Sequence, residues 1–119
     1  MNAEEIIKLK KNALYSSLEG KNYFGKFFNK SILHNAVIME VFSNNTSNGI
    51  SYEKLCFNIP KTVGSRSSIQ NLLNEGLAKK ILIKTENNKD KRIKNYYLSD
   101  DSAKMIIDWI KKQKLIFNS

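Results

Sequence analysis

Apolar residues recur at helical spacing along most of this chain. Residues 4–18 place Ile7, Leu14 and Leu18 about one or two turns apart, behind acids that suit a helix N-terminus. Residues 23–28 carry four aromatic side chains and are expected to start the next helix or to form a turn packed beneath it. From Ser31 the run ILHNAVIMEVF predicts a strongly buried helix. The expected inward face of this helix consists of Ile32, Ala36, Met39 and Phe42, with Leu33 and Val37 beside it.

The middle of the chain is punctuated by turn residues. The sequence NNTSNG at 44–49 is a turn signal, and Ser51 is a suitable cap for a short helix over 52–58. Pro60 predicts a break before a further helix, which starts between positions 62 and 65 and ends at Glu75. We expect Gly76 to follow that helix as its C′ residue.

The spacing then changes from helical to strand-like. Residues 77–84 and 93–99 predict two strands joined by the polar loop 85–92, which makes a β-hairpin with a basic tip. Ser99 then caps a final helix running to about position 117, with Ala103, Ile106, Ile107 and Ile110 on one face. The predicted fold is mainly α with a small antiparallel β-hairpin. It is a winged helix-turn-helix with additional N- and C-terminal helices.

Composition narrows the class of protein. With 119 residues, 41% of them hydrophobic, the chain has the size of a single domain covering residues 1–119. No apolar run reaches membrane-spanning length, residues 1–11 are charged and lack the apolar core of a signal peptide, and one cysteine cannot form an internal disulfide. We therefore expect a cytoplasmic protein that is not membrane-bound. With only one histidine and one cysteine, the sequence predicts no metal site, and no motif in it indicates a cofactor.

The net charge of +9 indicates a polyanionic partner such as nucleic acid. Its distribution is uneven. Residues 61–98 contain nine Lys or Arg and three acids, whereas residues 31–60 contain one Lys and two Glu. The excess therefore lies on the predicted recognition helix and hairpin.

Several short motifs in this region resemble those of the MarR-type transcription regulators. They are the glycine-containing NEGL at 74–77, the Asp-x-Arg at 90–92 and the Leu-Ser at 98–99, within a resemblance that covers about 31–110. The run KTVGSRSS departs from the Ser-x-x-Thr-Val-Ser-Arg pattern usual in the family, because Arg66 falls one position early when Leu72 is aligned.

The resemblance implies a homodimer that binds double-stranded DNA, with one helix per subunit in the major groove and the wing at the minor groove. In that arrangement, residues 50–76 are the helix-turn-helix and 77–98 the wing. Residues 1–30 and 100–119 carry apolar stripes that a small core would not fully cover, so we expect them to form the dimer interface.

Helical spacing separates two faces of the recognition helix. Ile69, Leu72 and Leu73 define the buried side, and Ser65 is expected to fall with them. The opposite face is neutral and rich in donors and acceptors; it consists of Gly64, Ser67, Gln70, Asn71 and Asn74. Gln and Asn can pair bidentately with adenine, whereas flanking cations suit phosphates. The predicted DNA-binding residues here are Lys61, Thr62, Ser65, Arg66, Ser67, Ser68, Gln70 and Asn71. Ordinary solvated side chains are the alternative interpretation.

The wing tip is the second region predicted to meet DNA. We expect Lys89, Lys91, Arg92 and Lys94 to contact the duplex, with Asp90 positioning Arg92 for a narrow minor groove. A solvated hairpin tip is the alternative.

The single cysteine, tryptophan and histidine are expected to have structural roles. We expect Cys56 to be a small buried residue rather than a redox sensor, and Trp109 to pack in the core or the dimer. His34 is expected at a helix flank or dimer contact, since no nucleophile–base–orienter set accompanies it in the sequence. A pocket for a small-molecule effector could be lined by Tyr15, Tyr23 and Phe27, but no convergent polar groups support it.

Three other functions remain as alternatives. A winged-helix protein–protein interaction module without specific DNA readout is the nearest, followed by single-stranded RNA binding. The aromatic residues follow predicted core stripes rather than a strand face on which bases would stack, which disfavours the RNA-binding alternative. An enzyme is the least favoured, because no triad, metal set or phosphate-binding glycine loop is evident.

Overall fold

The computed structural model describes residues 2–19, 22–46, 48–87 and 89–118, with side chains through 114. Within the two segments expected to form a dimer interface, residues 1, 20, 21 and 119 lie outside the described residues. The elements run in the order α1 (Ala3–Ser17), α2 (Tyr23–Phe28), α3 (Ile32–Ser43), β1 (Ile50–Ser51), α4 (Tyr52–Asn58), α5 (Arg66–Ala78), β2 (Leu82–Glu86), β3 (Lys94–Leu98) and α6 (Asp100–Asn118). The predicted winged helix-turn-helix with flanking helices is confirmed.

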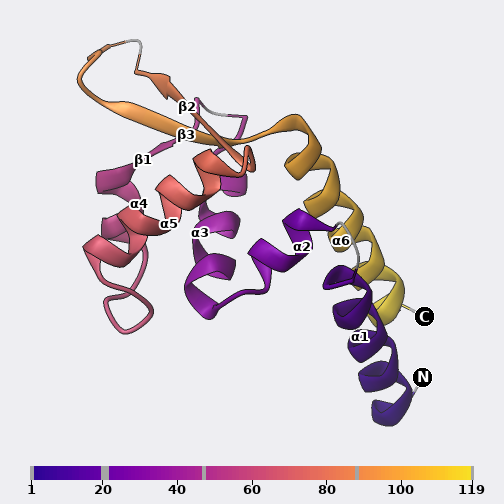
Figure 1. Ribbon diagram of the computed structural model, residues 1–119. Coiled ribbons are helices and arrows are strands. Elements are labelled where there is room, and N and C mark those ends of the chain that lie inside the picture. The colour runs from indigo at the N-terminus through magenta and orange to yellow at the C-terminus, as the bar shows by residue number, and fades with distance from the viewer. Residues whose placement is uncertain (1, 20–21, 47, 88, 119) are drawn as a thin grey trace.

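The molecule is elongated, with its terminal helices at one end (Figure 1). There α1 lies alongside α6. At the other end, α4 and α5 form the helix-turn-helix and the β2–β3 hairpin projects beyond them. Between the two ends, α2 and α3 carry much of the core. A surface formed by α4, α5 and the hairpin is therefore remote from a surface formed by α1 and α6.

Side-chain caps explain where the helices begin. Asn2, Asn22, Ser31, Ser51 and Ser65 each precede a helix, and each side-chain oxygen accepts a hydrogen bond from the backbone N–H three residues later. Such caps satisfy backbone donors that have no partner within the helix. The predicted cap and span of α4 are confirmed.

The inward face of α3 differs from the prediction. Val37, Ile38 and Val41 are buried, whereas Ile32 is 78% exposed and Met39 43% exposed. This helix is apolar nearly all round, so its periodicity does not select one face. The packing partners in α2 and α5 decide the orientation instead.

The end of α5 corrects the position of the helix stop. Gly76 does not follow the helix; it lies within it, and the chain remains helical to Ala78. Ile81 N–H donates to the Gly76 carbonyl and Lys80 N–H to that of Leu77, which is the Schellman arrangement with Lys80 at C′. Lys80 accordingly has φ of 60°. A Cβ on Gly76 would lie 2.6 Å from the Leu82 side chain, so close packing explains this glycine.

The sheet has three strands in the order β1–β3–β2, where the sequence predicted two. The pair β2–β3 is antiparallel, with Lys84 opposite Tyr96, and β1 adds Ile50 opposite Tyr96 on the other edge of β3. Two residues are too few for a strand period to be visible in the sequence. Residues 77–78, which the sequence placed in the first strand, belong to α5, so the wing itself covers 82–98.

The two terminal helices are only partly covered. No residue of α1 is buried, and Ile7, Leu14 and Leu18 are all at least 40% exposed. In α6, Ile106 is 2% exposed and Ala103 and Ile110 pack against the core, but Ile107 is 41% exposed. Ile107 thus lies at the exposed edge of the face on which the sequence placed it with Ile106, because consecutive helical positions diverge by about 100°.

A candidate nucleic-acid interface

The turn before α5 is exposed and differs from the prediction in two residues. Lys61 and Thr62 lie in this turn and are exposed. Gly64 precedes the helix and therefore belongs to no helical face; a Cβ there would lie 2.6 Å from the Leu33 side chain. Ser65 is the exposed N-cap of α5 rather than an inward residue, and its Oγ accepts from Ser68 N–H at 3.1 Å.

The two faces of α5 are otherwise arranged as the sequence indicated. Ile69, Leu72 and Leu73 are buried. The exposed polar residues of the helix are Arg66, Ser67, Ser68, Asn71 and Asn74. Gln70 is half-buried, and its amide Nε2 donates to Asn74 Oδ1 at 3.2 Å. The helix thus presents a row of hydroxyl and amide groups to solvent, which can hydrogen-bond to base edges.

Arg66 at the start of α5 is anchored to α4. Its guanidinium Nη2 lies 2.5 Å from Glu53 Oε1, and its guanidinium carbon lies 5.2 Å from the ring centroid of Tyr52. Tyr52 OH donates to the Arg66 carbonyl at 3.0 Å. The hydrogen bond and charge of Glu53 raise the pKa of Arg66 above its ordinary value. The Arg66 side chain is 60% exposed, so it remains accessible while it is paired.

The wing tip is organised by Asp90 and Arg92, as the Asp-x-Arg motif indicated. Asp90 Oδ1 accepts from the backbone N–H and from Nε of Arg92, at 3.0 and 3.1 Å, and Oδ2 accepts from Nη2 at 3.1 Å. These hydrogen bonds lower the pKa of Asp90 and raise that of Arg92. The Arg92 side chain is nevertheless 90% exposed. Its direction is therefore set by Asp90 while its outer edge faces solvent.

The wing lysines differ in their surroundings. Lys89 and Lys91 are exposed at the tip of the hairpin. Lys94 is 39% exposed, and its Nζ donates to Glu86 Oε1 at 3.1 Å and to the Lys91 carbonyl at 3.2 Å. Lys94 is thus paired along the hairpin, unlike the exposed Lys89 and Lys91 with which the sequence grouped it.

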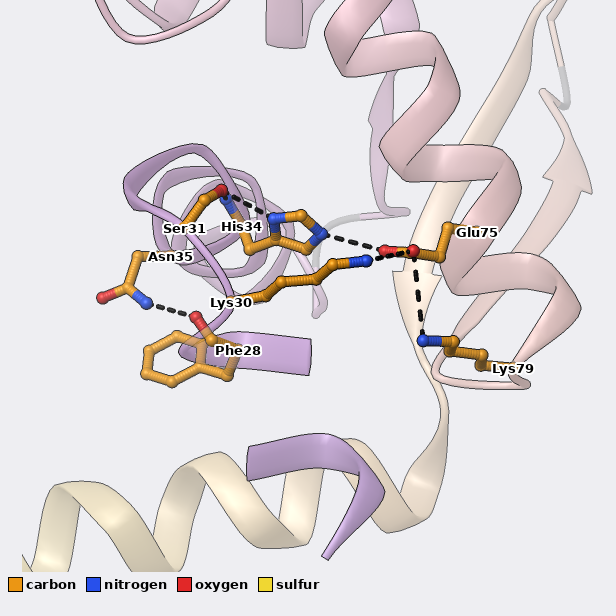
Figure 2. Close-up of polar contacts among 7 residues, drawn as sticks. All are labelled: Phe28, Lys30, Ser31, His34, Asn35, Glu75 and Lys79. Carbon is orange, nitrogen blue, oxygen red and sulfur yellow. Dashed lines mark hydrogen bonds and ion pairs between the residues drawn. The ribbon is translucent and has the colours of Figure 1, made fainter. Parts of the chain in front are cut away.

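His34 has partners that the sequence did not reveal. Its Nε2 lies 2.9 Å from Glu75 Oε1 and its Nδ1 2.7 Å from Ser31 Oγ (Figure 2). A serine, a histidine and a carboxylate are thus linked in a row, contrary to the expectation that no such set accompanies His34. Ser31 Oγ also caps α3 by accepting the His34 N–H at 3.1 Å, and Glu75 is shared with Lys30 at 2.7 Å. Each group therefore has a structural task, and the position of His34 at a helix flank is as predicted.

The cavity nearest the predicted effector site has a different lining. A hollow of about 230 Å³ lies between α1, α2 and α6, lined by Phe24, Phe28 and Trp109 among others. Tyr15 and Tyr23 are more than half exposed and Phe27 is buried in the core, so the three residues proposed from the sequence do not line it. Trp109 packs edge-on to Phe28 at 5.2 Å between ring centroids, in keeping with its expected packing role.

Other expected features can be placed in the described part of the chain. Cys56 is half-buried and packs against the core, rather than being fully buried. Across residues 2–19, 22–46, 48–87 and 89–118, no group of three His, Cys, Asp or Glu side chains is arranged to hold a metal ion. No helix in those same ranges combines the length and apolar character required to cross a bilayer.

Comparison with solved structures finds the same fold in several proteins. MepR of S. aureus, in a complex with DNA, superposes with a TM-score of 0.63 at 13% identity, over 96% of this chain and 80% of that one. YusO from Bacillus subtilis gives a TM-score of 0.55 at 16% identity, over 99% of this chain and 82% of that one. The transcriptional regulator SlyA gives 0.53 at 13% identity, over 97% and 74%.

Comparisons by sequence alone found no match. No family model matches the chain, and no curated protein matches its sequence. The shared architecture spans nearly the whole chain, including the helices on both sides of the wing. The resemblance seen in the short sequence motifs is therefore confirmed at the level of structure: this chain has the winged-helix fold of the MarR-type transcription regulators.

Proposed function

We propose that this protein is a sequence-specific, double-stranded DNA-binding transcription regulator that acts as a homodimer. The observation that carries the proposal is the common position of the polar face of α5 and the basic wing. The two elements that carry them, α5 and the β2–β3 hairpin, lie at the end of the molecule away from α1 and α6 (Figure 1). The net charge of +9 is concentrated in the segment that forms them. MepR, which has this fold, is described in complex with DNA.

In the proposed complex, α5 enters the major groove. Ser67, Gln70 and Asn71 meet base edges, with Ser65 and Ser68 at the start of the helix. Lys61, Thr62 and Arg66 lie where the flanking phosphates would pass. Arg92 reaches the minor groove from the wing tip under the control of Asp90, and Lys89, Lys91 and Lys94 contact the backbone.

Dimerisation through α1 and α6 is supported by their exposed apolar side chains. The exposed set comprises Ile7, Leu9, Leu14, Leu18, Met105 and Ile107. These residues lie on, or directly follow, two helices that pack along one another, and exposed apolar side chains gathered at one end of a molecule are typical of interfaces. Two copies joined at this end would carry two separate wings and two α5 helices, as a two-half-site operator requires.

A random duplex pool tests the proposal. Rounds of selection at about 100 mM salt, followed by mobility shifts of the enriched sequence and of a scrambled duplex, should give at least tenfold preference for the enriched duplex. Sedimentation velocity at micromolar concentration should give twice the 13.7 kDa chain mass. Equal binding of all duplexes would overturn sequence-specific regulation. Absence of any DNA binding, with the protein folded, would support the protein–protein interaction module instead.

A further inference from the structure

Glu75 joins α5 to a separate part of the fold through charged hydrogen bonds. Its carboxylate lies 2.7 Å from Lys30 Nζ, in the turn between α2 and α3, and 2.9 Å from His34 Nε2 on α3. Lys79, the C-cap residue that follows α5, approaches the same carboxylate at 3.9 Å. Figure 2 shows the side chains of Lys30 and His34 extending from the α2–α3 region toward Glu75 on α5. We call these four residues the Glu75 clamp.

His34 is held in place by contacts other than its hydrogen bond to Glu75. Its side chain is 12% exposed, its Nδ1 lies 2.7 Å from Ser31 Oγ, and its ring meets Phe27 edge-on with 4.8 Å between centroids. Phe27 is 1% exposed. The turn itself is tied down because Asn35 donates from its side-chain amide to the Phe28 carbonyl (Figure 2). The partner of Glu75 is therefore fixed in place by α2 and by the start of α3.

The Glu75 clamp gives α5 a directional restraint that its apolar packing lacks. Ile69, Leu72 and Leu73 hold α5 to the core, but burial of apolar surface is non-directional and tolerates small rotations or slides. Charge-assisted hydrogen bonds are short and directional. Glu75 lies four and five positions after Asn71 and Gln70 on one continuous helix, so fixing Glu75 fixes the axial position and rotation of the face proposed to read bases.

We propose that Glu75 is a positioning residue for DNA recognition, holding α5 in register against α2 and α3 through His34 and Lys30. This inference rests on the proposed function, because it concerns the accuracy with which α5 is presented to a duplex. Glu75 itself contacts no DNA in this arrangement. It acts through the geometry of Gln70 and Asn71, since small misplacements of hydrogen-bonding groups weaken readout of base edges.

The sign of the effect of Glu75→Ala on affinity tests the proposal. Loss of an acid raises the net positive charge, and electrostatics alone would tighten binding to any duplex. Loss of positioning should instead weaken binding to the enriched duplex by roughly threefold to tenfold, with little change on scrambled duplex. Glu40→Ala is the matched control, because it makes the same change of charge on α3, outside α5, the wing and the terminal helices. It should leave affinity unchanged or slightly raised.

Variants of His34 separate positioning from charge. His34→Ala should reproduce the loss of discrimination, and the double variant with Glu75→Ala should be no worse than either single variant, because both remove the same hydrogen bond. His34→Gln keeps an N–H donor and should recover part of the affinity. In each weakened variant, amide hydrogen exchange in residues 72–78 should accelerate at least threefold while exchange in β3 stays constant.

The outcomes distinguish this inference from the function on which it rests. If the wild-type protein selects no duplex, the proposed function fails, but accelerated exchange in α5 of Glu75→Ala would still report the clamp. If the wild type is selective and Glu75→Ala binds the enriched duplex as well as Glu40→Ala does, positioning by Glu75 is overturned.

Discussion

Arg66 Nη2 lies 2.5 Å from Glu53 Oε1, so the first residue of α5 is ion-paired with α4 before any ligand arrives. Both side chains are more than half exposed, and exposed pairs of this kind contribute little to folding. The pair matters more for binding. A phosphate that approaches Arg66 must compete with Glu53 for the guanidinium, and the Glu53 carboxylate repels the same phosphate.

Glu53→Gln should therefore strengthen DNA binding. We expect an affinity gain of about twofold to fivefold on every duplex and a salt dependence steeper by up to about one unit of log–log slope, because Arg66 becomes available to release a counterion. Arg66→Ala should weaken binding and abolish most of that gain in the double variant. An equal gain from Glu53→Gln with and without Arg66 would mean that the acid acts through long-range charge alone. Titrations at four salt concentrations provide the comparison.

Arg92→Ala should weaken DNA binding without affecting the fold. The side chain is 90% exposed, so thermal unfolding should be unchanged, whereas removal of its groove and phosphate interactions should cost on the order of 1–3 kcal/mol per subunit. Asp90→Ala is informative because it leaves the cation in place but removes its three hydrogen bonds. It should lower selectivity more than overall affinity. Wild-type affinity in Arg92→Ala would remove the wing tip from the interface.

Local signals in the sequence predicted most of the fold. Ser51 and Ser99 each marked a helix start because N-capping depends on one side chain and on backbone atoms three residues away. The buried side of α5 followed from Ile69, Leu72 and Leu73 because that helix has one apolar stripe. The nearly uniform apolar surface of α3 gave no such stripe, so the inward face had to be decided by tertiary packing.

The rest depended on contacts between distant positions. Glu75 and His34 are 41 positions apart, and no spacing rule joins them; only the packing of α3 against α5 does. The end of α5 was misplaced because a glycine near a helix end usually marks C′. Here Gly76 is required by the nearby Leu82 side chain, while Lys80 adopts the left-handed conformation. The apolar run at 77–84 is typical of a strand, so the sequence could not show that its first two residues, 77 and 78, belong to α5.

The free energy of unfolding should depend on Glu75 at acidic pH. Lys30, then His34, lower the pKa of Glu75 from 4.5 to about 2. A carboxyl whose pKa is lower in the folded state stabilises the fold above the unfolded pKa, and this contribution disappears as pH falls from about 4.5 to about 2. Its side chain is 27% exposed, so we expect on the order of 1–2 kcal/mol at neutral pH after screening.

Urea unfolding from pH 7 to pH 2.5 measures this contribution. The difference in free energy of unfolding between wild type and Glu75→Gln should be largest at neutral pH and should shrink below about pH 4.5. Other acids titrate in the same range in both proteins, so the difference isolates Glu75. A difference that does not vary with pH would contradict the assigned charge interaction.

Lys80→Gly should stabilise the protein. A residue with a Cβ at φ of 60° is strained, whereas glycine adopts this conformation readily at the C′ position of a helix. We expect a gain of about 0.5–1 kcal/mol in the free energy of unfolding. Lys80→Ala is the matched control, since it removes the same charge but keeps the Cβ, and it should give no such gain. Equal stabilities of the two variants would show that the conformation is not strained.

The final prediction separates base readout from charge. Asn71 is exposed on α5 and Gln70 lies beside it in a hydrogen bond with Asn74, so alanine substitutions at 70 and 71 should reduce the preference for enriched over scrambled duplex. The salt slope should hardly change, because neutral amides release no counterions. Lys89→Ala or Lys91→Ala should instead weaken binding to both duplexes alike and lower the slope by about one for each lysine–phosphate interaction that the substitution removes. If the amide variants weakened both duplexes equally, the reading surface would have to be rotated toward Arg66 and Ser68, which are also exposed on the first turn of α5.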